Sequence, residues 1–112
     1  MPSDALTSSR LYLRNPLEDR CAERRPVMIA GWLRPSAGHR FPVIVRDLSI
    51  AGFSCETTTR IGVGTLCWLT FPGLAGQQSE MVWNTGHMVG CAFSTLLSPL
   101  VLDNILARYP HM

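Results

Sequence analysis

Lysine is absent from this sequence, so all 10 basic residues are arginine. Arginine presents a planar fork of donors that suits phosphate oxygens and the edge of guanine, and it can stack on an aromatic ring. A genome-wide bias towards arginine over lysine would explain the same composition equally well. The formal net charge of only +2 argues against an extended polyanion, so we expect no binding of DNA or RNA and leave a small anionic ligand open.

Long hydrophobic runs are also missing, since no stretch reaches the roughly 20 apolar residues that cross a bilayer. The first residues are mostly polar and lack the apolar centre of a signal peptide. We therefore expect a cytoplasmic protein without membrane insertion. The cysteines include no Cys-x-x-Cys pair and the histidines have no ligand spacing, which predicts neither a metal site nor a disulfide framework. We interpret Cys55, Cys67 and Cys91 as core residues.

Signatures of catalysis are lacking too. The sequence has no nucleophile elbow, no glycine loop that grips phosphate, and no pair of carboxylates placed for acid–base work. Ser49 has no histidine nearby in sequence that could serve as its base. The sequence therefore predicts that the protein is not an enzyme and needs no cofactor.

What is present fits one domain with a single apolar core, because 112 residues are too few for two. The hydrophobic share of 46% lies far from the composition of disordered chains. Residues 1–19 have no sustained hydrophobic period, and we expect them to form a mobile N-terminal arm that precedes a domain over residues 20–112.

Short runs rich in Val, Ile, Trp and Phe follow Pro26, separated by glycine and proline clusters, which is typical of an all-β barrel or sandwich. We expect an antiparallel meander in which Asn84, Thr85 and Gly86 join the last two strands as a hairpin. Trp32 and Trp68 lie in apolar runs and are predicted to be in the core. The six predicted strands cover residues 27–33, 41–48, 52–57, 65–71, 79–84 and 87–94.

A helix is predicted after the last strand. Ser98 is a good N-cap, Pro99 suits the first turn, and Pro110 ends the helix. The apolar residues between them recur at helical spacing, so one face of the helix must be buried. We expect that face to close an open end of the barrel, with burial against another protein as the alternative.

Two polar groupings carry the functional argument. In the first, Arg20 and Arg24 are four residues apart at the junction of arm and barrel, and a coiled loop could bring both guanidinium groups to one ligand. Arg25 adjoins them and could assist.

The second grouping lies at a turn between two strands. Asp47 can accept hydrogen bonds from the ring N–H and amino group of guanine, and Ser49 can bond a phosphate or carbonyl oxygen. Gly52 lets the chain pass close to a ligand. Arg46 directly precedes Asp47, and strand alternation predicts that its side chain lies on the opposite face.

Together the two groupings, Arg-x-x-x-Arg and then Asp-x-Ser-x-x-Gly, resemble the motif pair of the PilZ family. The likeness extends from Arg20 to Tyr109. It implies a six-stranded antiparallel β-barrel with a C-terminal helix that binds cyclic di-GMP. By this resemblance Arg20 and Arg24 would hold guanine and phosphate, and Asp47, Ser49 and Gly52 the other guanine side.

Trp83 could stack on a guanine, as a surface aromatic does in some members of that family, or it could pack in the core. The expected function is a receptor that orders its arginine arm over the ligand and signals to an unidentified downstream protein, with a homodimer possible. Two alternatives stay open: a barrel without ligand binding that serves protein contacts, and a barrel for single-stranded nucleic acid.

Overall fold

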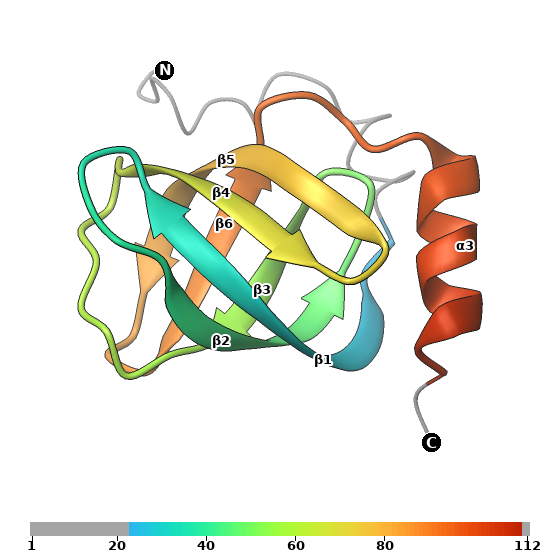
Figure 1. Cartoon of the computed structure of the whole chain (residues 1–112), viewed down its shortest axis with the longest axis horizontal. Coiled ribbons are helices and arrows are strands. Elements are labelled where there is room, and N and C mark those ends of the chain that lie inside the picture. The colour runs from blue at the N-terminus through green and yellow to red at the C-terminus, as the bar shows by residue number, and fades with distance from the viewer. Residues whose placement is uncertain (1–22, 111–112) are drawn as a thin grey trace, which may run out of the picture.

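Side chains alternate between the barrel interior and its outer surface along the first strand. In the computed structural model, which describes residues 23–110, the first strand, β1 (Arg25–Pro35), buries every second side chain from Val27 to Leu33 and exposes those between. The remaining elements are β2 (Phe41–Leu48), β3 (Gly52–Glu56), β4 (Leu66–Phe71), β5 (Leu74–Asn84), β6 (Met88–Phe93) and the helix α3 (Pro99–Arg108), as shown in Figure 1.

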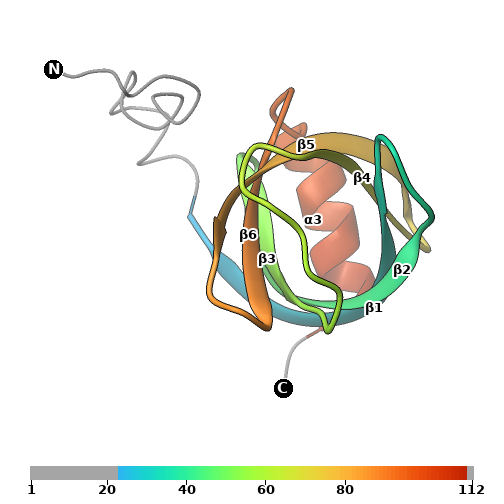
Figure 2. The ribbon, with the colours of Figure 1, turned by 90° about the vertical axis from the view of Figure 1, so that its left-hand side faces the viewer.

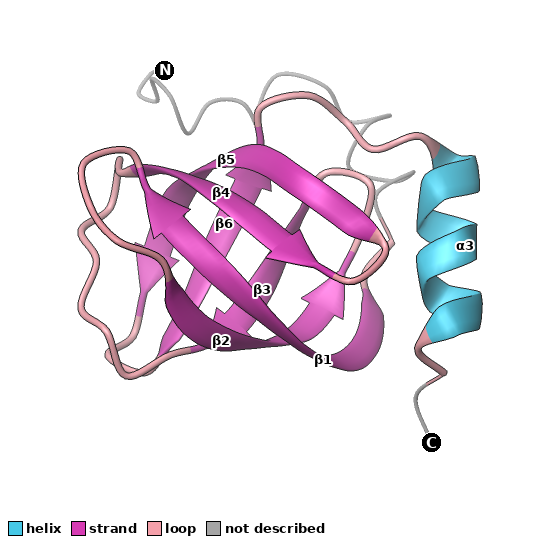
Figure 3. Ribbon diagram, viewed as in Figure 1, coloured by secondary structure: helices cyan, strands magenta, loops and turns pink. Residues whose placement is uncertain are grey.

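The six strands form a closed antiparallel barrel in the order β1-β2-β3-β6-β5-β4, with β4 paired back to β1. The predicted fold class is therefore confirmed: a barrel followed by one C-terminal helix (Figure 3). The expected meander is wrong, because β3 pairs with β6 and not with β4. The connection over residues 57–65 crosses one end of the barrel, while α3 lies at the other end (Figure 2).

The bounds of the predicted strands agree with the structure to within two residues except at the start of β5. That strand begins at Leu74, five positions before the predicted start at Ser79. The cause is the tight turn between β4 and β5, where Gly73 has a positive φ of 103° and lets the chain reverse at once. The predicted hairpin between β5 and β6 is confirmed, and Gly86 has a φ of 109° there.

Aliphatic and aromatic side chains from all six strands fill the barrel. Phe53 is fully buried among them and contacts Phe93, with 5.5 Å between the ring centroids. The interpretation of three cysteines as core residues is confirmed, because Cys55, Cys67 and Cys91 are free and buried. Burial raises the pKa of Cys55 to about 12, so this thiol stays protonated at neutral pH.

The helix closes its end of the barrel as expected. Ser98 caps it, since its side chain accepts a hydrogen bond from the N–H of Leu100. Leu102 and Ile105 are buried in the common core, and the Tyr109 ring meets Phe71 edge to face with 5.8 Å between centroids.

The prediction that Trp32 and Trp68 lie in the core is wrong. The neighbours of Trp32, Gly31 and Leu33, point inward, so alternation turns Trp32 outward, where it is 39% exposed. In β4 the inward positions around Trp68 belong to Cys67 and Leu69, and Trp68 is only partly buried on the outer face. Within residues 23–110 no helix has the length and apolar character needed to cross a membrane.

Candidate functional site

A β-bulge presents Asp47 on the outer face of the barrel. Val45 pairs with Cys55 and Asp47 with Ser54, so one extra residue, Arg46, stands between them on β2. The expectation that Arg46 and Asp47 lie on opposite faces is wrong, because the bulge interrupts the alternation. The Arg46 guanidinium forms an ion pair with Glu56 on the outer surface.

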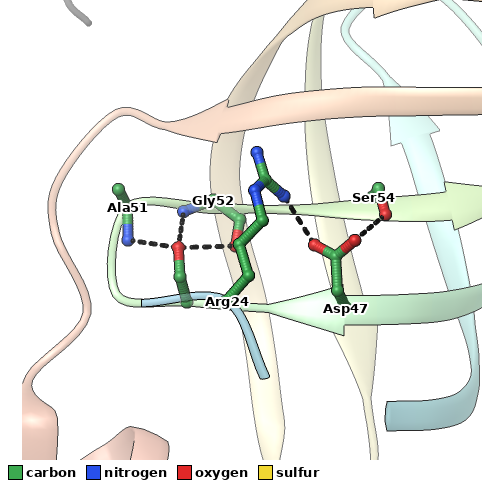
Figure 4. A network of polar contacts seen from close by, with 6 residues as sticks. Arg24, Asp47, Ala51, Gly52 and Ser54 are labelled. Atoms are coloured by element: carbon green, nitrogen blue, oxygen red, sulfur yellow. Dashed lines mark hydrogen bonds and ion pairs between the residues drawn. The ribbon is translucent and has the colours of Figure 1, made fainter. Parts of the chain in front are cut away.

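The Asp47 carboxylate has two partners, one at each oxygen (Figure 4). The Arg24 Nη1 donates to Oδ1 over 2.6 Å, and the hydroxyl of Ser54 donates to Oδ2. The Asp47 side chain is 28% exposed and that of Arg24 is 56% exposed, so the pair lies at the solvent boundary. Ser54 on the neighbouring strand β3 thus orients the carboxylate, and Arg24 holds its other oxygen.

Ser49 forms the turn between β2 and β3. It is 4% exposed, and its Oγ accepts hydrogen bonds from the N–H groups of Ala51 and Gly52, each over 3.1 Å. The backbone N–H of Ser49 donates to the carbonyl oxygen of Gly52 over 2.9 Å and closes the turn. In the structure the Ser49 hydroxyl therefore holds the loop that follows Asp47 in shape.

Gly52 is needed for a close approach of two strands. A Cβ at this position would lie 2.2 Å from the carbonyl oxygen of Cys91 and 3.2 Å from the Cα of Ala92 on β6. Both contacts are with backbone, which cannot move aside as a side chain can. Gly52 thus packs the Asp47 turn directly against β6.

Strand register aligns the outer-face residues of the site in one row. Pro26 pairs with Asp47, Asp47 with Ser54, Ser54 with Gly90, and Gly90 with Trp83. The row therefore crosses five neighbouring strands from β1 to β5.

Trp83 is on the outer surface and not in the core. It is 37% exposed, and its indole lies directly over Gly90. A Cβ added at Gly90 would be 2.1 Å from the Trp83 Nε1. Gly90 has no side chain, so the indole can cover its backbone, and both Gly90 and Ser54 are buried. The Trp83 indole and the Asp47 carboxylate therefore lie on one outer surface, with β3 and β6 between their strands.

Basic side chains border this surface at its β1 side. Arg24 contacts Asp47 directly, while Arg25 lies beside Glu23, with 3.8 Å between Nε and Oε1. The first motif arginine, Arg20, and the arm over residues 1–19 lie outside the described residues. In the range 23–110, no three His, Cys, Asp or Glu side chains gather as a metal site would need.

Sequence reasoning missed two members of the row. Ser54 orients the Asp47 carboxylate, and Gly90 leaves room for the Trp83 indole, yet neither residue belongs to the motif pair. A glycine within a strand often marks the close approach of another group, and Gly90 is such a case. Ser54 could be found only from the register, because a bulge shifts it opposite Asp47.

Chemically, the site offers a carboxylate acceptor, a forked cation and an exposed indole on one face. A planar purine-like ring with an amino group and a nearby phosphate would use all three. In comparisons with known proteins, no protein-family model and no curated protein matches this sequence.

Proposed function

We propose that this chain is a PilZ-type receptor for cyclic di-GMP that binds the ligand on the surface between Arg24, Asp47 and Trp83. The observation that carries the proposal is the row across β2, β3, β6 and β5, which places the Asp47 carboxylate on the same outer face as the partly exposed indole that covers Gly90. A guanine lying there would stack on the indole and donate its ring N–H and amino group to Asp47.

The ion pair between Arg24 and Asp47 is an exchangeable contact in this proposal. Exposed ion pairs contribute only about 0.2–1 kcal/mol, so its loss costs little when a guanine takes the place of Arg24 at the carboxylate. The released guanidinium then faces the ligand phosphates, to which it can donate two parallel hydrogen bonds.

The arginine arm adds the second half of the binding site. Arg20 and Arg24 would both contact the ligand, with Arg25 as an additional cation, and the segment around them would become ordered over the ligand. The ordered arm presents a new surface, and a downstream protein would recognise that surface. Because the two arginines are four residues apart, both reach the ligand only if this segment coils.

Calorimetric titration with cyclic di-GMP tests the proposal. We expect saturable heat with the native chain and at least a tenfold loss of affinity in Arg24→Ala, since a charge-assisted hydrogen bond to phosphate is worth about 1.5–3 kcal/mol. Arg60→Ala is the matched control, because Arg60 is an exposed arginine in the crossing loop far along the chain from the site.

A further variant tests the role of the carboxylate. Asp47→Asn keeps the shape of the side chain and removes the carboxylate, so it should weaken cyclic di-GMP binding while the barrel still melts cooperatively. If the native chain gives no heat at ligand concentrations well above micromolar, or if Arg24→Ala and Arg60→Ala bind alike, the proposed function is wrong. The barrel would then be assigned to protein contacts alone.

A further inference from the structure

A second surface of the barrel carries tryptophan and arginine side chains in a regular arrangement. On the outer face of β1 and β4, Arg34 pairs across the strands with Trp68, and Trp32 pairs with Thr70. Arg40 reaches the same face from the residues between β1 and β2.

Each of the two arginines stacks on an indole. The Arg34 Cζ lies 4.7 Å from the centroid of the Trp68 ring, and the Arg40 Cζ lies 4.3 Å from that of Trp32. Such stacking fixes a guanidinium in place while its N–H groups remain directed outward at the rim of the ring. The two cations are therefore held in position before any partner arrives.

These four side chains surround a hollow of about 300 Å³ whose lining also includes Thr70 and Gly76. The absence of a side chain at Gly76 leaves room beside Trp68, since a Cβ there would touch the Trp68 ring at 3.8 Å. The hollow thus combines two aromatic walls with two cations and one hydroxyl.

The charge of this hollow is not neutralised within the described residues. The ion pairs formed over residues 23–110 involve Arg24, Arg25 and Arg46, and neither Arg34 nor Arg40 takes part in one. The lining of the hollow contains no acidic residue. An anionic group would therefore meet two fixed cations without displacing an existing partner.

An apolar groove of about 460 Å³ adjoins the hollow, and Trp32 lines both. Ala30, Pro42 and Ile44 contribute to its lining from the outer face of β1 and β2. Its far end is formed by residues that include Glu56 and His87. Trp32 thus stands as a ridge between an apolar groove and a cationic hollow.

We propose that this composite surface docks an acidic segment of a partner protein, with an apolar side chain in the groove and carboxylates at Arg34 and Arg40. Tryptophan and arginine are the residues most enriched among the energetic centres of protein interfaces. A strand of nucleic acid fits less well, because it needs a continuous basic track, and here the track ends at an apolar groove that carries Glu56.

The docking surface is distinct from the proposed cyclic di-GMP site. Along β1, Pro26 borders the Asp47 row and Trp32 borders the hollow, and six residues of strand span about 20 Å. The hollow is therefore well separated from that site, and the apolar groove comes nearer to it, because Glu56 in the groove lining is two residues from Ser54 along β3. The proposal stands whether or not the chain binds cyclic di-GMP.

The three tryptophans allow a direct test by fluorine NMR on the full chain labelled with 5-fluorotryptophan. The probe is a synthetic peptide that repeats Asp-Leu-Glu-Phe, and the matched neutral peptide repeats Asn-Leu-Gln-Phe. We expect the acidic peptide to shift the signals of Trp32 and Trp68 in a saturable way while that of Trp83 stays in place. Single Trp→Phe variants assign the three signals.

Charge reversal then identifies the cations. The double variant Arg34→Glu, Arg40→Glu should lose at least tenfold in affinity for the acidic peptide, whereas Arg60→Glu should bind as the native chain does. An unchanged Trp83 signal in each variant verifies that the barrel is folded.

Several results would overturn the proposal. Absence of any shift at millimolar peptide, equal binding of the neutral peptide, or equal loss in Arg60→Glu would each do so. Tighter binding of oligothymidylate than of the acidic peptide would reassign the surface to single-stranded nucleic acid. None of these results bears on cyclic di-GMP, whose binding is followed at Trp83 and Arg24.

Discussion

A single methyl group added at Gly52 should destabilise the whole barrel. In Gly52→Ala the new Cβ would lie 2.2 Å from the carbonyl oxygen of Cys91, about 1 Å closer than the shortest ordinary contact. The neighbouring Cα of Ala92 prevents a sideways shift, since it would lie only 3.2 Å away. Relief therefore requires β3 and β6 to separate where Gly52 pairs with Ala92.

The expected cost follows from overpacking. Extra methylene groups forced into a packed interior cost about 1–3 kcal/mol, and the upper end applies here because the obstructing atoms are backbone atoms of β6. A loss of about 3 kcal/mol should lower the Tm of a domain of this size by roughly 15 °C. Gly62→Ala is the matched control, because its Cβ would approach nothing closer than the Thr65 Oγ1 at 4.0 Å.

Thermal and urea unfolding of the two variants, each against the native chain, measure the difference. Gly62→Ala should unfold within about 0.5 kcal/mol of the native chain. If Gly52→Ala is as stable as Gly62→Ala, the close approach of the Asp47 turn to β6 is wrong, and with it the packing on which the site depends.

Three further predictions concern the turn, the core and the indole. Ser49→Ala should cost about 1–3 kcal/mol in urea unfolding, because it leaves two backbone N–H groups of the turn without their acceptor. Burial raises the pKa of Cys55 from 9.0 to about 12, so the stability that the protonated thiol contributes is complete below pH 9 and is lost as the pH rises from 9 towards 12. By about pH 10.5 the free energy of unfolding of the native chain should fall by about 2 kcal/mol, and that of Cys55→Ala should not show this fall. Gly90→Ala should displace the Trp83 indole, which an unchanged tryptophan emission spectrum would contradict.

Much of the fold can be predicted from local patterns. The strand runs alternate between inward and outward residues, and the helix has both an N-cap at Ser98 and a proline in its first turn. Pattern reasoning located the end of β4 correctly but missed the early start of β5, because residues 74–78 contain few of the branched and aromatic residues that indicate strands.

Strand order could not be predicted in the same way. Alternation reveals which side chains are buried, but it does not reveal which strand lies beside which. The pairing of β3 with β6 depends on a crossing loop and on the close approach at Gly52, both of which are tertiary features. The outward position of Trp32 and Trp68, by contrast, was predictable from alternation. The prediction that they lie in the core followed the apolar composition of their strands instead.

The residues of the candidate site were predictable only in part, since the motif pair contains neither Ser54 nor Gly90, and their arrangement was not predictable. The motif pair contains both Arg24 and Asp47, and the structure adds that they form an ion pair with each other. The alignment of Asp47, Ser54, Gly90 and Trp83 depends on two bulges, one between Val45 and Asp47 and one between Met81 and Trp83. Each bulge changes the register by one residue, which no local sequence pattern indicates.

The most direct test of the account is a titration of the isotope-labelled chain with cyclic di-GMP, followed in nitrogen–proton correlation spectra. If cyclic di-GMP binds as proposed, we expect saturable changes at the Trp83 indole N–H, at the Gly90 amide and over residues 47–52, with the indole signals of Trp32 and Trp68 unmoved. Spectra that do not change at millimolar ligand, or changes centred on Trp32 and Trp68, would contradict it.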